Sequence, residues 1–122
     1  MKSYKDIASS SDAFILSSPE YHGTMSGVMK NNLDFLSFDQ TTNKSFALMS
    51  TLGGQYNSNT LNHMRISIRW LHGWVVPEQA AVGNVRSAFD ENGDLVDEKL
   101  DMRIRDMARS LIDSAKYLRS KR

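Results

Sequence analysis

Three short apolar runs stand out along the chain, at residues 13–16, 46–49 and 74–76. Each run is continuous rather than alternating with polar residues, and serine, glycine or proline lies at one or both of its ends. Continuous runs of this length are typical of strands that are buried on both faces, as in a parallel sheet. The pattern therefore predicts three parallel strands, the third of which ends before Pro77.

Outside these runs, apolar residues recur every three or four positions, which is the spacing of one face of a helix. Helices are predicted from about residue 26, from residue 58 or 59, and from Asp94 or Asp97. Residues 2–10 fit the last turns of another helix, whereas residues 38–43 are predicted to be a polar connector. The expected helix faces toward the core are Tyr4, Ile7 and Ala8; Met25, Met29, Leu33 and Leu36; Leu61, Met64, Ile68 and Leu71; and Leu100, Ile104, Met107, Leu111, Ala115 and Leu118.

The alternation of helices and strands predicts one α/β domain over residues 1–122, with about three parallel strands and three to four helices. Ligands of such sheets bind outside the carboxyl ends of the strands. The first two predicted strands lead into residues 19–24 and 50–55, so both loops are expected at one rim of the sheet.

Composition and charge remove several classes of protein. The chain has 122 residues, no cysteine and a formal net charge of +1. Disulfides and thiolate chemistry are excluded, a cytoplasmic location is expected, and no apolar run is long enough to span a bilayer. The near-neutral charge gives nucleic-acid binding no general support. The basic residues 118–122 are interpreted as the cationic end of a helix.

The loop over residues 19–24 carries the richest chemistry. It offers an aromatic ring, an imidazole, a carboxylate and accessible backbone amides, which suit a flat heteroaromatic ligand, although an ordinary loop after a proline explains it as well. Gly53 and Gly54 fit either a bound phosphate or a tight turn. No metal site is expected, because the three histidines are not paired at helical spacing and no cysteine is available.

Several motifs occur in a characteristic order: residues 12–16, the sequence Pro-Glu-Tyr-His-Gly at 19–23, Lys30-Asn31 with Asp34, and Phe-Asp-x-x-Gly-x-Leu at 89–95. In this order they resemble the NADPH-dependent FMN reductase family, whose members are flavodoxin-like and include flavin, quinone, azo and chromate reductases. An ion pair within one helix remains the alternative explanation for Lys30 and Asp34.

The resemblance implies a flavin reductase that uses FMN, with NAD(P)H as co-substrate, and that passes electrons to a small acceptor such as a quinone, an azo compound or a metal oxyanion. Hydride transfer is chemistry of the cofactor, so no catalytic protein acid or base is expected, and Glu20 and His22 would shape the site. The implied cofactor-binding residues are Pro19, Glu20, Tyr21, His22, Gly23 and Thr24 in the first loop, and Ser50, Thr51, Leu52, Gly53, Gly54 and Gln55 in the second.

The resemblance also aligns this chain with the C-terminal part of the family domain, from its third strand onward. It implies a flavodoxin-like sheet truncated before that point, without the loop that holds the FMN phosphate. An apolar strand edge would then be exposed, so a homo-oligomer or a complementing N-terminal fragment is expected as partner. The alternative function is a non-enzymatic remnant or interaction module that pairs through this edge.

Overall fold

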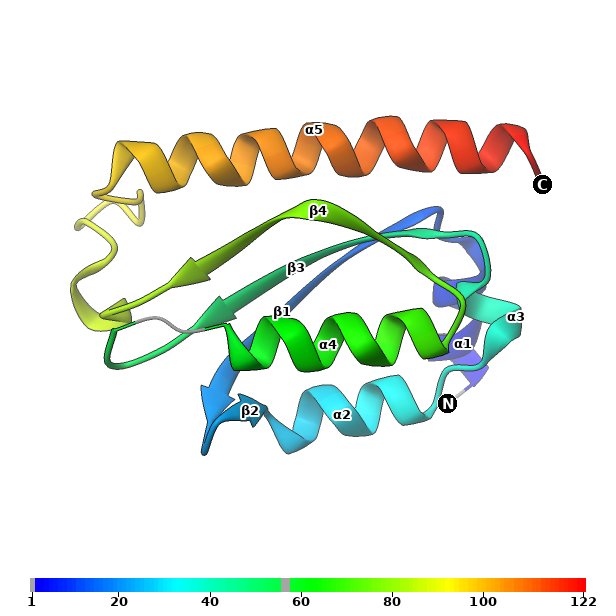
Figure 1. The fold of residues 1–122 in the computed structure, drawn as a ribbon, viewed down its shortest axis with the longest axis horizontal. Helices are drawn as coiled ribbons and strands as arrows, with labels where there is room; N and C mark the ends of the chain where they lie inside the picture. The colour runs from blue at the N-terminus through cyan, green and yellow to red at the C-terminus, as the bar shows by residue number, and fades with distance from the viewer. Residues whose placement is uncertain (1, 56–57) are drawn as a thin grey trace.

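The computed structural model describes residues 2–55 and 58–122, which form one four-stranded sheet with helices on both faces (Figure 1). None of the helices in these residues is long and apolar enough to span a membrane. The strands are β1 (Ala13–Tyr21), β2 (Thr24–Met25), β3 (Ser45–Thr51) and β4 (Trp74–Val82). The helices are α1 (Lys2–Ser10), α2 (Gly27–Asp34), α3 (Phe38–Thr41), α4 (Asn59–Trp70), the 3-10 turn η1 (Val85–Ser87) and α5 (Glu98–Ser120).

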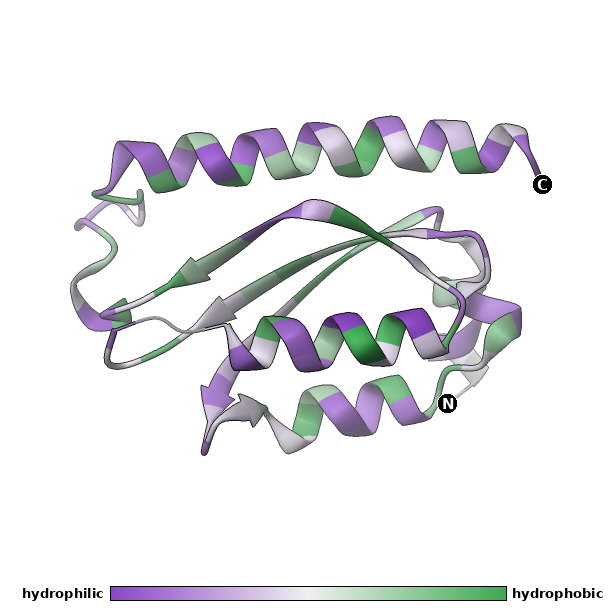
Figure 2. Ribbon diagram, viewed as in Figure 1, coloured by the Kyte–Doolittle hydropathy of each residue, from purple (hydrophilic) through white to green (hydrophobic). Residues whose placement is uncertain are grey.

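The sheet has the order β2-β1-β3-β4, and its three long strands are parallel as predicted. In Figure 1, α5 covers one face of the sheet while α2 and α4 lie on the other. Hydrophobic positions follow the strands and alternate with polar positions along the helices (Figure 2). The result is the layered α/β arrangement that the alternation of elements predicted.

The parallel register brings the ends of the long strands to the same level. Pro19 of β1 pairs with Thr51 of β3, and Thr51 in turn pairs with Val82 of β4. The segments that follow these three positions therefore leave the sheet side by side. This is the rim at which the sequence placed both candidate loops.

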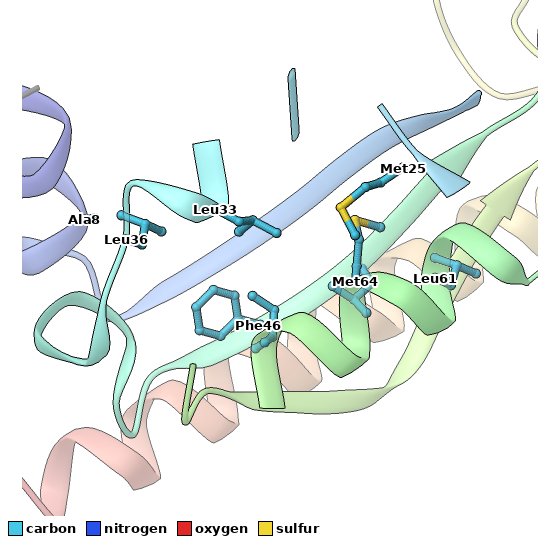
Figure 3. Close-up of a cluster of buried hydrophobic side chains, with 9 residues drawn as sticks. Ala8, Met25, Leu33, Leu36, Phe46, Leu61 and Met64 are labelled. Atoms are coloured by element: carbon cyan, nitrogen blue, oxygen red, sulfur yellow. The ribbon is translucent and has the colours of Figure 1, made fainter. Parts of the chain in front are cut away.

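The larger core cluster lies between the sheet and α4. Phe46 and Leu48 of β3 are fully buried against Met64 and Ile68 of α4. The side chains of Met25 and Met64 meet in this cluster, which joins β2 to the helix (Figure 3). Burying a side chain of this size contributes about 1.5–3 kcal/mol to folding, so this contact fixes the helix to the strands.

A second cluster lies under α5, where Ala47 and Val76 contact Met107 and Leu111. Because Ala47 faces α5 while its neighbours in β3 face α4, β3 is buried on both faces, as its apolar run predicted.

Two strands are longer than predicted. β1 continues through Pro19 to Tyr21, because its last two residues extend past the part paired with β3 and pair with β2 in an antiparallel hairpin. β4 continues through Pro77 to Val82, because Pro77 lies on an edge strand at an irregularity in register, where its missing N–H costs no ladder hydrogen bond. Neither proline ends its strand.

Two helix predictions also need correction. The expected connector at 38–43 contains helix α3, whose start has a capping box formed by Ser37 and Gln40. Ile7 is 63% exposed, so Ala8 and Tyr4 face the core without it. At the other terminus, Arg119 and Arg122 pair with Asp12, which attaches the basic end of α5 to the residue before β1.

We expect Gly73→Ala to lower the free energy of unfolding by about 1–3 kcal/mol, the usual cost of overpacking a core. A Cβ atom at Gly73 would lie 2.6 Å from Ile68 Cγ2 and 2.6 Å from Phe46 Cε2. Urea unfolding followed by circular dichroism measures the change. Gly27→Ala is the matched control, because no atom lies within 4 Å of its Cβ position and alanine favours a helix. Equal stability of the two variants would contradict this packing.

Candidate functional site at the carboxyl rim of the sheet

The first candidate loop is a tight hairpin rather than an irregular loop. Tyr21 of β1 pairs with Thr24 of β2, and His22 and Gly23 form the turn between them. Both turn residues have left-handed backbone, with φ of 51° at His22 and 87° at Gly23. This is the geometry of the type I′ turns that match the twist of a hairpin. The tip of the hairpin is therefore set by the backbone, and Gly23 removes the steric cost at one of its two positions.

Two serines attach the hairpin to the fold beneath it. The hydroxyl of Ser18 is buried and accepts a hydrogen bond of 3.0 Å from the backbone N–H of Ser26. Ser26 also caps α2, because its hydroxyl accepts from the N–H of Met29 at 3.1 Å. The hairpin thus continues directly into a capped helix.

The second candidate loop is held by the end of β4. The N–H of Leu52 donates to the carbonyl of Val82 at 3.0 Å, and the N–H of Val85 donates to the carbonyl of Leu52 at 3.1 Å. The N–H of Asn84 donates to the carbonyl of Gly54 at 2.7 Å. These three bonds continue the β3–β4 pairing into the loop and give residues 52–54 a defined path.

Both loops present unpaired backbone donors at the rim. Among the residues that the structure describes, no acceptor is hydrogen-bonded to the N–H groups of His22, Gly23, Gly53, Gly54 or Gln55. No atom lies within 4 Å of a Cβ position built on Gly53 or Gly54, and neither glycine has positive φ. The fold therefore does not itself require glycine at 53 and 54, and their backbone stays open to a ligand.

The predicted site residues differ in how accessible they are. Tyr21 is 60% exposed at the end of β1, and His22, Gly53, Gly54 and Gln55 are also exposed. The remaining residues are more covered. Pro19, Glu20, Gly23, Thr24, Thr51 and Leu52 are half-buried, and Ser50 is buried inside β3. The rim thus unites both loops, with its accessible groups concentrated at the tip of each.

The Lys30–Asp34 pair of the motif forms an ion pair of 2.7 Å along α2, with both side chains more than half exposed. An exposed pair at this spacing contributes a few tenths of a kcal/mol to helix stability. The structure therefore places it on the surface of a helix, in accord with the alternative explanation of this motif.

Three contacts at the rim involve residues that sequence reasoning did not select. Thr60 and His63 of α4 hydrogen-bond to Glu20 and Thr24 of the hairpin, and Asn84 holds the second loop. The contacts from α4 join positions about 40 residues apart, so no local sequence pattern predicts them.

A cavity of about 590 Å³ lies past the end of β4 rather than between the two loops. Its lining includes Asn84, Lys99 and Arg103. The order of the strands places the second loop between this cavity and the hairpin.

The fold and the open rim define a flavodoxin-like α/β domain whose candidate ligand site lies at the carboxyl ends of its strands. Residues 1–87 match the model of the family described as NADPH-dependent FMN reductase. The chain therefore belongs to the NADPH-dependent FMN reductase family, as the order of its motifs predicted.

Curated relatives and solved structures agree with this assignment. An FMN-dependent NADPH-azoreductase of Staphylococcus aureus (strain USA300) is 36% identical over 96% of this chain, and the match spans 65% of that protein. An oxidoreductase of Corynebacterium diphtheriae has a TM-score of 0.71 at 20% identity, over 98% of this chain and 64% of its own. An NADH:FMN oxidoreductase in its apo form has a TM-score of 0.61 at 19% identity, over 98% of this chain and 58% of its own.

We expect Ser18→Ala to destabilise the protein by about 1–3 kcal/mol, because it leaves the buried N–H of Ser26 without an acceptor. Thermal and urea unfolding measure the loss. The neighbouring exposed hydroxyl provides the control, since Ser17→Ala should change stability by less than about 0.5 kcal/mol. Equal effects of the two substitutions would show that the Ser18–Ser26 bond does not support the hairpin.

Proposed function

We propose that this chain forms the flavin-ring site of an NAD(P)H-dependent FMN oxidoreductase. In this proposal the isoalloxazine ring lies at the rim between the hairpin of residues 19–24 and the loop of residues 50–55. A nicotinamide is the electron donor and a small oxidised molecule is the acceptor.

The unpaired backbone donors at the tips of both loops carry this proposal. The pyrimidine edge of an isoalloxazine ring presents two carbonyl oxygens, which require hydrogen-bond donors when they leave water. The N–H groups of His22, Gly23, Gly53, Gly54 and Gln55 have no acceptor among the described residues. The exposed ring of Tyr21 offers an aromatic surface beside them. These residues fit a flat ring with a polar edge.

The protein's part in the reaction is binding and orientation. Bound FMN supplies the two-electron hydride chemistry, for which the protein needs no acid or base of its own. The hairpin amides and the amides of Gly53 and Gly54 would hold the polar edge of the ring, and Tyr21 would offer it an aromatic contact. The carboxylate of Glu20 accepts a hydrogen bond from Thr60 in α4, which connects the hairpin to that helix. Its role is to shape the hairpin.

The azoreductase relative supports an acceptor of the azo type, which is a flat conjugated molecule. The chain spans 65% of the length of this relative. The activity of a whole enzyme is therefore part of the proposal, together with its acceptor and its nicotinamide donor.

We expect Tyr21→Ala to weaken FMN and riboflavin binding about twofold to tenfold, since it removes an aromatic contact worth roughly 0.5–1.5 kcal/mol. Gly54→Val should also weaken binding while leaving stability within about 0.5 kcal/mol, because its side chain would occupy the open space of the rim. Quenching of flavin fluorescence measures both affinities. Val28→Ala, on the exposed surface of α2, is the control. Unchanged titration curves for Tyr21→Ala and Gly54→Val would contradict the assignment of the rim.

A second function is favoured by the free edge of β1. Over residues 13–19, β1 pairs with β3 on one side, and no other described strand pairs with it on the other. Ile15 on this edge is 51% exposed. The opposite edge strand, β4, is protected, because Arg65 and Arg103 donate hydrogen bonds to the backbone carbonyls of Val76 and Gln79. An open apolar edge is a template for pairing with another strand. We therefore propose that β1 pairs with a second copy of the chain or with a complementing fragment.

We expect light scattering at micromolar concentration to give a mass of at least twice 13.8 kDa. Ile15→Lys should lower the measured mass to that of a monomer, since a lysine on an edge strand opposes strand pairing. Ile7→Lys, which alters a still more exposed residue on α1, should leave the mass unchanged. A stable species of 13.8 kDa for the unmodified chain would contradict pairing with a second copy.

A further inference from the structure

Helix α4 contacts the hairpin through side chains on one of its faces. Thr60 and His63 lie three positions apart, so their side chains project from neighbouring turns toward the same side. Thr60 reaches Glu20 at the end of β1, and His63 reaches Thr24 at the start of β2. The two bonds thus hold both strands of the hairpin, one on each side of the His22–Gly23 turn.

The bond from Thr60 is the more sheltered of the two. Its hydroxyl donates to Oε1 of Glu20 at 3.0 Å, and the residue is fully buried. A buried hydroxyl that loses its partner is costly, which makes this bond an effective constraint on Glu20. Glu20 adjoins Tyr21 in β1, so holding Glu20 also restrains the backbone from which the exposed ring projects.

The bond from His63 fixes the other strand. Nδ1 of His63 lies 2.6 Å from Oγ1 of Thr24, the residue that follows the turn. Next to this bond, Met25 is buried against the Leu61–Met64 turn of α4 (Figure 3). A two-stranded hairpin is marginally stable by itself, and β2 has only two residues. The position of the turn therefore depends on α4.

The same helix follows the second loop. Gln55 ends the described part of that loop, and α4 begins four residues later at Asn59. One rigid element therefore adjoins both groups of unpaired amides. The end of β4 holds the second loop, so contacts between α4 and the hairpin decide where the hairpin amides lie relative to it.

We infer that Thr60 and His63 are positioning residues, which set the hairpin amides and Tyr21 at the spacing that a flavin ring requires. This inference rests on the proposed function, because it concerns the same rim. Each residue acts through its hairpin partner, Thr60 through Glu20 and His63 through Thr24.

The test pairs each disruptive substitution with one that keeps the hydrogen bond. Thr60→Val keeps the shape of the side chain and removes the hydroxyl, whereas Thr60→Ser keeps the hydroxyl. His63→Ala removes the ring, whereas His63→Asn keeps an amide that can donate or accept a hydrogen bond near the position of Nδ1. Ser67→Ala is the control on α4, because the Ser67 hydroxyl bonds within the helix and not to the hairpin.

Two measurements are made on the full chain. Amide hydrogen exchange over residues 20–25 without flavin reports the mobility of the hairpin, and titration with FMN reports affinity and the shape of the flavin absorption bands. We expect Thr60→Val and His63→Ala to speed exchange and weaken FMN binding about threefold to tenfold, the range expected for one lost hydrogen bond. The absorption bands should also change shape, since the ring environment loosens. Thr60→Ser, His63→Asn and Ser67→Ala should behave like the unmodified chain.

Unchanged exchange and affinity in Thr60→Val and His63→Ala would overturn the inference. Failure of Thr60→Ser and His63→Asn to restore them would overturn it as well, because the residues would then act by packing alone. The proposed function is tested separately. If the unmodified chain bound no flavin, the proposed function would be wrong. The inference that Thr60 and His63 position a flavin ring would then be wrong too, even if hydrogen exchange showed that α4 anchors the hairpin.

Discussion

The burial of β3 on both faces is the constraint on which the rest of the structure depends. Phe46 and Leu48 face α4 while Ala47 faces α5, and all three are fully buried. A shift of one residue would exchange the two faces and bring Ala47 to the side that Phe46 and Leu48 fill, so the register of β3 is strongly specified. Its neighbours then align with it, which brings Pro19, Thr51 and Val82 to one level. Without this register the two loops would not share a rim.

Packing and polar contacts have different roles at that rim. The contact between Met25 and Met64 belongs to the core and fixes β2 near α4, but an apolar contact has no directional preference. Hydrogen bonds are directional, so the bonds from Ser18, Thr60 and His63 define the orientation of the hairpin. Because two of these bonds come from α4 and the third joins β1 to the start of α2, the loop geometry is a consequence of tertiary structure as much as of the turn residues.

The sequence predicted those features that local patterns determine. Strong periodicity located α4 and α5, and continuous apolar runs located β1, β3 and β4. Strand lengths were underestimated at Pro19 and Pro77, because whether a proline interrupts a strand depends on the strand's neighbours rather than on its own sequence. The loops were identified from their residue types and from a family resemblance. Thr60 and His63 could not be identified that way, since their partners lie in a different element and become neighbours only after the sheet forms.

The two open surfaces of this domain follow from one principle. Backbone N–H and C=O groups require partners, and a fold that leaves them unpaired leaves them available for another molecule. On the edge of β1 these groups form a straight row, which suits a strand. At the rim they lie at the tips of two loops, among glycines and beside an aromatic ring, which suits a flat ligand with a polar edge. In the proposed functions, unmet hydrogen bonding serves strand pairing at one surface and ring recognition at the other, and the geometry around the groups decides which.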